Sequence, residues 1–111
     1  MTEVLDFQSV PVNLGLAGDK PFAKPDEAEC WRKDTVRFQS VDPFTVDFKN
    51  ESPFATDPIE GAKTNGLYEA VVTVRPDAPD DDHHYPYTLT VGGHTVDPEI
   101  VVKKDPTQNG N

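Results

Sequence analysis

The sequence predicts a single all-β domain, folded as a Greek-key β-sandwich, on three observations. The chain has 111 residues, which is a usual length for one domain. Short runs rich in Val, Thr, Phe and Tyr alternate apolar and polar residues, as strands with one buried face do. Eleven prolines and seven glycines separate these runs, and no long stretch has the apolar periodicity of a helix. We therefore expect about seven or eight strands, without a repeat or a second domain.

The N-terminal part of the chain is expected to contribute two strand segments. One should lie within residues 4–9, and the next within residues 10–16, where Val and Leu alternate with smaller or polar residues. Residues 19–21 and 24–26 each combine Lys, Pro and Asp, which is typical of turns. The following strand should therefore begin only after residue 26.

Residues 27–31 alternate acidic residues with small or apolar ones, which predicts a strand with one buried face. Ala28 and Cys30 should point inward, and Cys30 is expected to be a buried structural thiol, as free cysteines commonly are. Since the chain has one cysteine, no intrachain disulfide can form. Residues 32–34 should form a polar turn.

The middle of the chain contains the clearest alternation. Residues 35–39 predict a strand with Val36 and Phe38 on one face, and the Asp42-Pro43 pair should end it. Residues 44–48 then alternate Phe, Val and Phe with Thr and Asp, which strongly favours a half-buried strand.

A long loop is expected over residues 50–65, which contain two prolines and a glycine. Its apolar members Phe54 and Ile59 should hold it against the body of the domain. Loops of this length often carry function, but a plain crossover between sheets is the other interpretation.

The last third predicts three strands. Residues 67–75 form the first, with Tyr68, Ala70, Val72 and Val74 pointing inward, and residues 76–82 form an acidic turn region. Residues 85–91 form the second. Pro86 lacks a backbone donor, so this strand should begin at a sheet edge or irregularly.

The chain should turn at Gly92-Gly93, and residues 99–103 should form the last strand, with Ile100 and Val102 inward. We expect the domain to span residues 1–104. Residues 105–111 should be a flexible polar tail.

Three segments resemble, in this order, the motifs K-G-D-x-V-x-F, x-P-H-x-V-x-F and Y-x-Y-x-C…H…M…I-x-V of the cupredoxin family, of the plastocyanin and azurin type. They are Trp31–Phe38, Asp42–Phe48, and Tyr85–Leu89 followed by Ile100–Val102. Asp34 takes the acidic position of the first motif, where Lys33 replaces the glycine. The resemblance covers residues 28–103 and implies a cupredoxin-like sandwich. An immunoglobulin-like sandwich is the alternative.

The resemblance also implies where a type 1 copper site, built from two histidines, a cysteine and often a methionine, would lie. The first histidine position holds Phe44. The cysteine position falls at Thr88 or Leu89, the later histidine position near Val91 or Gly92, and the methionine position near Val96. Because none of these side chains ligates copper in that way, we expect the scaffold without the metal, and no cofactor.

Composition limits the partners. The formal net charge of −10 disfavours nonspecific binding to nucleic acid or to an anionic membrane, because both need a positive face. Solubility is the simpler interpretation of this charge, and a basic protein partner is the alternative. No run is long and apolar enough to span a bilayer. The first residues lack the features of a signal peptide, so the expected compartment is the cytoplasm. A chain trimmed of a signal peptide, and hence periplasmic or secreted, is the alternative.

The run Asp80–His84 is the most unusual local feature. Asp82, His83 and His84 are weak candidates for binding a divalent metal, but consecutive acids cannot easily converge, and a solvated acidic turn is the simpler interpretation. No motif of a catalytic triad, a phosphate-binding loop or a glycosidase stands out, so we expect no enzyme activity.

The sequence therefore favours a metal-free module that binds another protein. It would use loops at one end of the sandwich, formed by Pro43-Phe44 and by residues 50–65 and 92–98. The candidate binding residues are Phe44, Phe54, His94 and Trp31. A carbohydrate- or small-ligand-binding sandwich, with Trp31 and the tyrosines as stacking platforms, is the second hypothesis.

Overall fold

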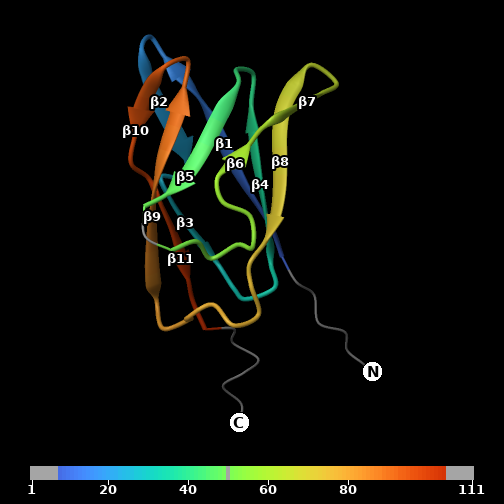
Figure 1. Cartoon of the computed structure of the whole chain (residues 1–111), viewed down its shortest axis with the longest axis vertical. Coiled ribbons are helices and arrows are strands. Elements are labelled where there is room, and N and C mark those ends of the chain that lie inside the picture. The colour runs from blue at the N-terminus through green and yellow to red at the C-terminus, as the bar shows by residue number, and fades with distance from the viewer. Residues whose placement is uncertain (1–7, 50, 105–111) are drawn as a thin grey trace.

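The computed structural model describes residues 8–49 and 51–104, and this part of the chain contains strands and turns but no helix (Figure 1). The strands are β1 (Ser9–Ala17), β2 (Lys20–Lys24), β3 (Glu27–Cys30), β4 (Thr35–Ser40), β5 (Phe44–Phe48), β6 (Ile59–Glu60), β7 (Ala62–Thr64), β8 (Leu67–Thr73), β9 (His83–Val91), β10 (His94–Val96) and β11 (Glu99–Val102). The expected all-β class is confirmed. Among the described residues, no helix is long and apolar enough to cross a membrane.

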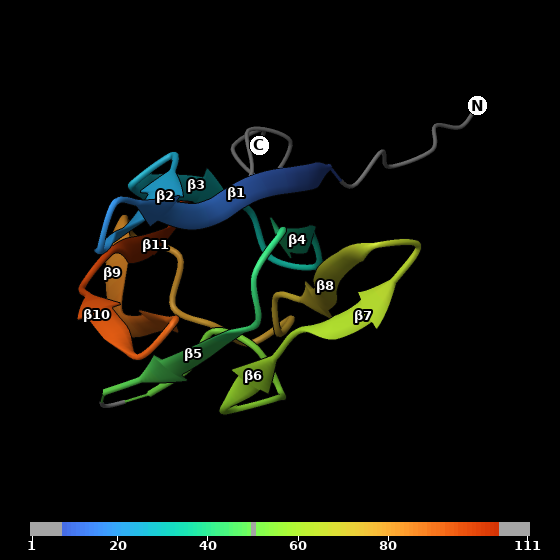
Figure 2. The ribbon, with the colours of Figure 1, turned by 90° about the horizontal axis from the view of Figure 1, so that it is seen from above.

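The strands form two mixed sheets that pack face to face, as Figure 2 shows from above. One sheet has the order β2-β1-β4-β8-β7, and the other has the order β3-β11-β9-β5-β6, with β10 also paired to β9. Two pairs, β1 with β4 and β3 with β11, are parallel, and the other pairs are antiparallel. The architecture is therefore a β-sandwich.

The core lies between the sheets and follows the alternation of the sequence. Val36 and Phe38 of β4 are fully buried, and Ala28 and Cys30 of β3 are each 1% exposed, as predicted. The four inward residues of β9 are also buried; they are Tyr85, Tyr87, Leu89 and Val91. Phe38 lies at the centre, where its ring meets those of Phe44, Phe54 and Tyr87.

Both sides of the sandwich are closed by chain segments that pass from one sheet to the other. β2 belongs to the five-stranded sheet, and β3, two residues later, belongs to the other sheet. On the opposite side, β6 and β7 change sheets in the same way across Gly61. Such corners are typical of sandwiches in which a strand bends between layers, and they leave short edges.

Several boundaries differ from the predictions. Lys20 and Pro21 belong to β2 rather than to a turn, because an edge strand tolerates a proline without losing a ladder hydrogen bond. The expected loop over residues 50–65 contains β6 and β7, although Phe54 and Ile59 are buried against the core as predicted. Residues 94–96 form β10, paired with β9, where a loop was expected.

One burial prediction needs correction. Asp34, placed in a polar turn, is fully buried, because its carboxylate accepts hydrogen bonds from neighbouring segments. On β8, Tyr68, Ala70 and Val72 pack against the core as predicted, although they are only partly buried, and Val74 beyond the strand is fully buried. The strand predicted within residues 4–9 and the tail predicted at 105–111 fall largely or wholly outside the described residues.

The prediction for Pro86 is confirmed. Residues His83 to Pro86 of β9 pair with β11 on one side, whereas the pairing with β5 on the other side begins only at Tyr87. The start of β9 is therefore an edge, where a residue without an amide hydrogen is tolerated.

Candidate functional site

Three two-residue turns lie at one end of the sandwich, which is the upper end in Figure 1. Gly18-Asp19 joins β1 to β2, Asn65-Gly66 joins β7 to β8, and Gly92-Gly93 joins β9 to β10. Asn65, Gly66, Gly92 and Gly93 all have positive φ. A two-residue hairpin turn whose twist matches that of its strands requires positive φ at both turn residues, and glycine adopts such values without strain. The turn between β4 and β5, which contains Pro43, lies at the same end.

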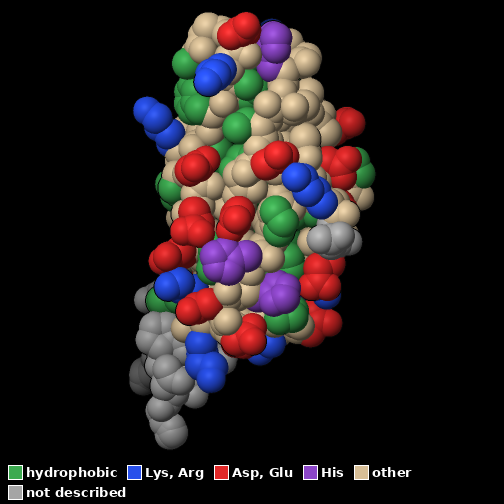
Figure 3. Space-filling model, turned by 90° about the vertical axis from the view of Figure 1, so that its left-hand side faces the viewer, with side chains coloured by type: hydrophobic (Ala, Val, Ile, Leu, Met, Phe, Trp, Pro, Cys, Tyr) green, Lys and Arg blue, Asp and Glu red, His purple; other side chains and the backbone are tan. Residues whose placement is uncertain are grey.

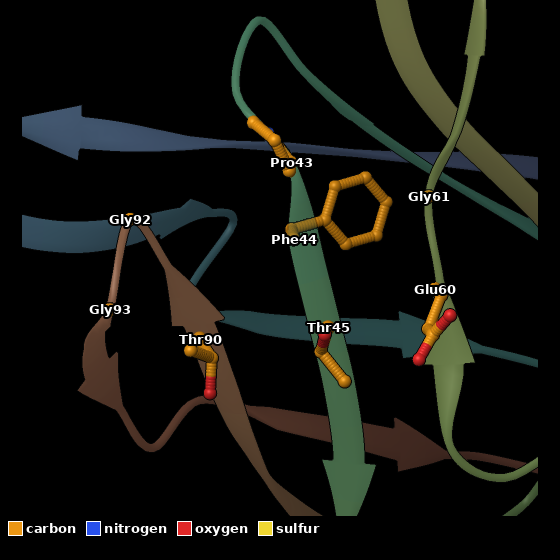
Figure 4. Close-up of a pocket in the computed structure, with 8 residues that line it drawn as sticks. All are labelled: Pro43, Phe44, Thr45, Glu60, Gly61, Thr90, Gly92 and Gly93. Atoms are coloured by element: carbon orange, nitrogen blue, oxygen red, sulfur yellow. The ribbon is translucent and has the colours of Figure 1, made fainter.

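Phe44 closes the core at this end. It begins β5 and is only 4% exposed, and its ring centroid lies 6.4 Å from that of Phe38. Figure 4 shows the Phe44 ring turned toward Gly61. A Cβ atom at position 61 would overlap this ring, and the Gly61 amide donates a hydrogen bond of 3.2 Å to the Phe44 carbonyl. Because Gly61 has no side chain, the corner between β6 and β7 passes directly over the Phe44 ring, which is the aromatic plug of this end.

A shallow groove of about 460 Å³ lies beside the plug, over the ends of β5, β6 and β9 (Figure 4). Thr45 forms its centre, because β5 lies between the other two strands and Thr45 pairs in register with both Glu60 and Thr90. The full lining is Pro43, Phe44, Thr45, Glu60, Gly61, Thr90, Gly92 and Gly93. Small side chains and exposed backbone suit an extended segment better than a bulky apolar ligand.

The groove has a negative edge. Glu60 is exposed, and Asp47 lies two residues from Thr45 on the same outward face of β5. Among the described residues, neither carboxylate has a basic side chain within 4.0 Å, whereas each of the other described glutamates faces an arginine, a lysine or a histidine. The site therefore offers uncompensated negative charge beside a shallow surface.

The expected copper positions also lie at this end. Phe44 pairs in register with Val91 of β9, and Leu89 and Thr88 lie two and three residues earlier on that strand. Val91 is fully buried, and the next residues are the Gly92-Gly93 turn. Phe44 and Val91 are hydrocarbon side chains, which do not ligate copper.

The four candidate binding residues do not come together. His94 is exposed on β10 and pairs with Val91, so it lies at the same end as Phe44. Trp31 and Phe54 lie near the opposite end, where Lys33 and Phe54 both pair with the chain at Val74. Phe54 is 3% exposed and packs against Phe38 and Phe48, so it belongs to the core.

Two of the three tyrosines are unavailable as stacking platforms. Tyr85 is 1% exposed and Tyr87 is fully buried, and neither hydroxyl has a hydrogen-bond partner among the described residues. Burial, with a smaller contribution from the negative charge of Asp26, raises the pKa of Tyr87. Trp31 is half-buried at the other end of the molecule, so no aromatic platform forms at the groove.

The side chains of the run Asp80–His84, which leads into β9, do not converge on one point. His83 stacks on Tyr85 with its Nε2 atom 3.6 Å from Glu51, and Asp82 lies 4.0 Å from Lys103. His84 instead faces Glu27 and Glu99 on the two neighbouring strands. The sequence analysis named His84 as a weak candidate ligand, but it did not identify Glu27 and Glu99 beside it, because they are distant in the chain.

No protein-family model and no curated protein sequence matches the chain.

Proposed function

We propose that this chain is a cupredoxin-like interaction module without the type 1 copper ligands, and that its groove beside Phe44 binds a basic segment of a partner protein. The observation that carries the proposal is the pairing of a shallow groove with the unpaired carboxylate of Glu60, in a chain of net charge −10. The proposal assigns binding to this end of the sandwich and no catalysis.

The strand order supports the cupredoxin type over the immunoglobulin-like alternative. Both sheets contain a parallel pair, β1 with β4 and β3 with β11. Sandwiches of the immunoglobulin constant type are built from antiparallel sheets. The segments that carry the family resemblance also fall where strands begin. Asp34 directly precedes β4, and Pro43 directly precedes β5.

Charge supports a basic partner. Complementary potentials speed encounter and fix orientation, and an exposed carboxylate without a neighbouring cation has no ion pair to break when a lysine or arginine approaches it. The groove is bordered by β6, a strand of two residues, and by exposed turns. A rigid sandwich that presents such turns is a common arrangement for recognition surfaces.

The second hypothesis, a carbohydrate-binding sandwich, has less support. Sugar recognition by stacking needs exposed aromatic faces, and Tyr85 and Tyr87 are buried in the core. The groove itself contains one aromatic residue, Phe44, and that ring is 4% exposed.

A peptide titration followed by NMR tests the proposal. A lysine-rich decapeptide added to the ¹⁵N-labelled protein should shift the amide signals of Thr45, Gly61, Thr90 and Gly92. The variant Glu60→Lys should weaken binding about fivefold or more, which corresponds to about 1 kcal/mol for a charge contact at a surface. Added salt should weaken it further, because exposed charges are screened.

The control is Glu51→Lys, which changes the net charge by the same amount beside His83, away from the groove. This variant should bind the peptide within about twofold of the parent protein. Equal losses for the two variants would mean that total charge, not the groove, attracts the peptide. Signal shifts confined to another face, or turnover of a small substrate, would also contradict the proposal.

A further inference from the structure

Three strands of the six-stranded sheet bring Glu27, His84 and Glu99 together on its outer face. Glu27 lies on β3, Glu99 on β11 and His84 on β9, and these strands are neighbours. Glu27 and Glu99 are register partners, and His84 lies diagonally from Glu99, two residues from its partner Pro86. Figure 3 shows histidine side chains with carboxylates around them in the lower half of this side of the molecule.

The ligand atoms of the three residues lie close enough to share one ion. They are all within 4.8 Å of one another. The Nδ1 atom of His84 is 2.5 Å from Oε1 of Glu99 and 3.6 Å from Oε2 of Glu27. Bonds of about 2.0–2.1 Å to a tetrahedral zinc ion place neighbouring ligand atoms about 3.3 Å apart. Side-chain rotations alone would therefore bring the three atoms into coordination geometry.

Charge at this cluster is not balanced by a fixed cation. Like charges directly opposite each other on neighbouring strands are unfavourable, and Glu27 and Glu99 hold such positions. The nearby Lys103 pairs with Glu29 and Asp82 instead. Among the described residues, His84 is the only ion-pair partner within 4.0 Å of either carboxylate, and it is charged only when protonated.

The donor set indicates the class of metal. One imidazole nitrogen and two carboxylates suit borderline divalent ions such as Zn²⁺, Co²⁺ and Ni²⁺, whereas Ca²⁺ and Mg²⁺ prefer sites made of oxygen atoms. Three protein ligands leave at least one coordination position for water. Glu27 and His84 are exposed and Glu99 is partly exposed, so the ion would be accessible from solvent.

We infer that this chain has a divalent transition-metal site on the outer face of the six-stranded sheet, with Glu27, His84 and Glu99 as its ligands. The site is separate from the groove beside Phe44, and from the copper position that the family resemblance implies. Of the run Asp80–His84, it uses His84 alone. Asp82 and His83 point to other partners and contribute no ligand.

Calorimetric titration of the full, chelator-treated chain with ZnCl₂ tests the inference. Because the hydrogen bond that His84 donates to the Glu99 carboxylate raises the pKa of His84, protons compete with the metal, and the titration is run at about pH 8. We expect one ion per chain. His84→Ala, Glu99→Gln and Glu27→Gln should each weaken binding at least about tenfold. CaCl₂ in place of ZnCl₂ should give no comparable heat.

The matched controls are His83→Ala and His94→Ala, which remove the other two histidines of the chain. Both should keep Zn²⁺ affinity within about twofold of the parent, because neither residue belongs to the cluster. Long-range ¹H–¹⁵N spectra should show zinc on Nδ1 of His84, the atom that faces both carboxylates. Circular dichroism would show that each variant keeps its fold.

Three results would overturn the inference. The first is the absence of binding at about 0.5 mM Zn²⁺, a concentration that would reveal even a weak site. The second is unchanged affinity in both glutamate variants. The third is loss of binding in His83→Ala with retention in Glu99→Gln, which would place the ion on the run Asp80–His84 through His83 instead.

Discussion

The two ends of the sandwich are held together by different forces. At the end away from the groove, the fully buried carboxylate of Asp34 accepts hydrogen bonds from the Gln8 amide at 2.8 Å, the Gln8 side chain at 2.9 Å and the Trp31 amide at 2.7 Å. Its main chain also pairs with that of Val74 at 2.8 Å. At the groove end, Phe44 fills space beneath Gly61, and tight turns join the strands.

This difference explains why the groove end is the place for a variable surface. Hydrogen bonds to a buried charge fix donors, acceptors and distances at once, so few substitutions preserve them. The aromatic plug constrains mainly the volume of the side chains that pack around it, and the turns nearby face solvent. The polar end therefore acts as the rigid base of the scaffold, while residues on the groove surface can change without unfolding the domain.

The strongest test of this comparison is the removal of the buried carboxylate. Asp34→Ala leaves two backbone amides and the Gln8 amide group without their acceptor. Hydrogen bonds to charged groups are worth about 1.5–3 kcal/mol each, and a buried unpaired donor adds its own cost. We expect the free energy of unfolding, measured in urea, to fall by at least about 3 kcal/mol.

Asp47→Ala is the matched control, because Asp47 is exposed on β5 and has no ion-pair partner among the described residues. Its effect should stay within about 0.5 kcal/mol, as is usual for surface positions. A loss of less than about 1 kcal/mol in Asp34→Ala would mean that the polar end is not held by this carboxylate.

A smaller effect is expected at the plug. Gly61→Ala places a methyl group against the Phe44 ring, and overpacking of this kind costs about 1–3 kcal/mol. Combined with Phe44→Leu, which shortens the plug, the alanine should cost about 1 kcal/mol or less, because the clash is relieved. Urea unfolding of both single variants and the double variant gives the coupling energy. Additive losses would show that Gly61 is required for some reason other than the ring.

The same comparison shows what the sequence could predict. Strands such as Phe44–Phe48 and Tyr85–Val91 were predictable, because alternation is a local signal that the sandwich reproduces directly. β6 and β7 have two and three residues, too few for a periodic signal. One local signal was present, since Asn65-Gly66 is the strongest two-residue hairpin sequence and predicts strands on both sides of it.

The sites depended on long-range placement. Residue order alone does not say which end of a sandwich a turn reaches, so Trp31 and Phe54 were grouped with Phe44, although they lie toward the other end. In the same way, Glu27, His84 and Glu99 meet only because β3, β11 and β9 are adjacent. Their grouping follows from sheet order and register, which the sequence did not predict.

The smallest effect should be seen in the rate at which Cys30 reacts with a thiol reagent in the native protein. Its side chain is 1% exposed beside the polar end, and burial, together with the charge of Asp34, raises its pKa from 9.0 to about 12. The thiolate is the reactive form, so an Ellman assay at about pH 8 should give almost no reaction until the domain opens.

Because this pKa is raised in the folded state, the unfolded chain releases the thiol proton first. Stability is therefore lost as the pH rises from 9 toward 12. Asp34→Asn should speed the Ellman reaction by loosening the segment around Cys30, whereas Phe44→Leu at the other end should leave its rate nearly unchanged. Equal acceleration in the two variants would mean that the sandwich opens as one unit, and that its two ends are not independently stabilised.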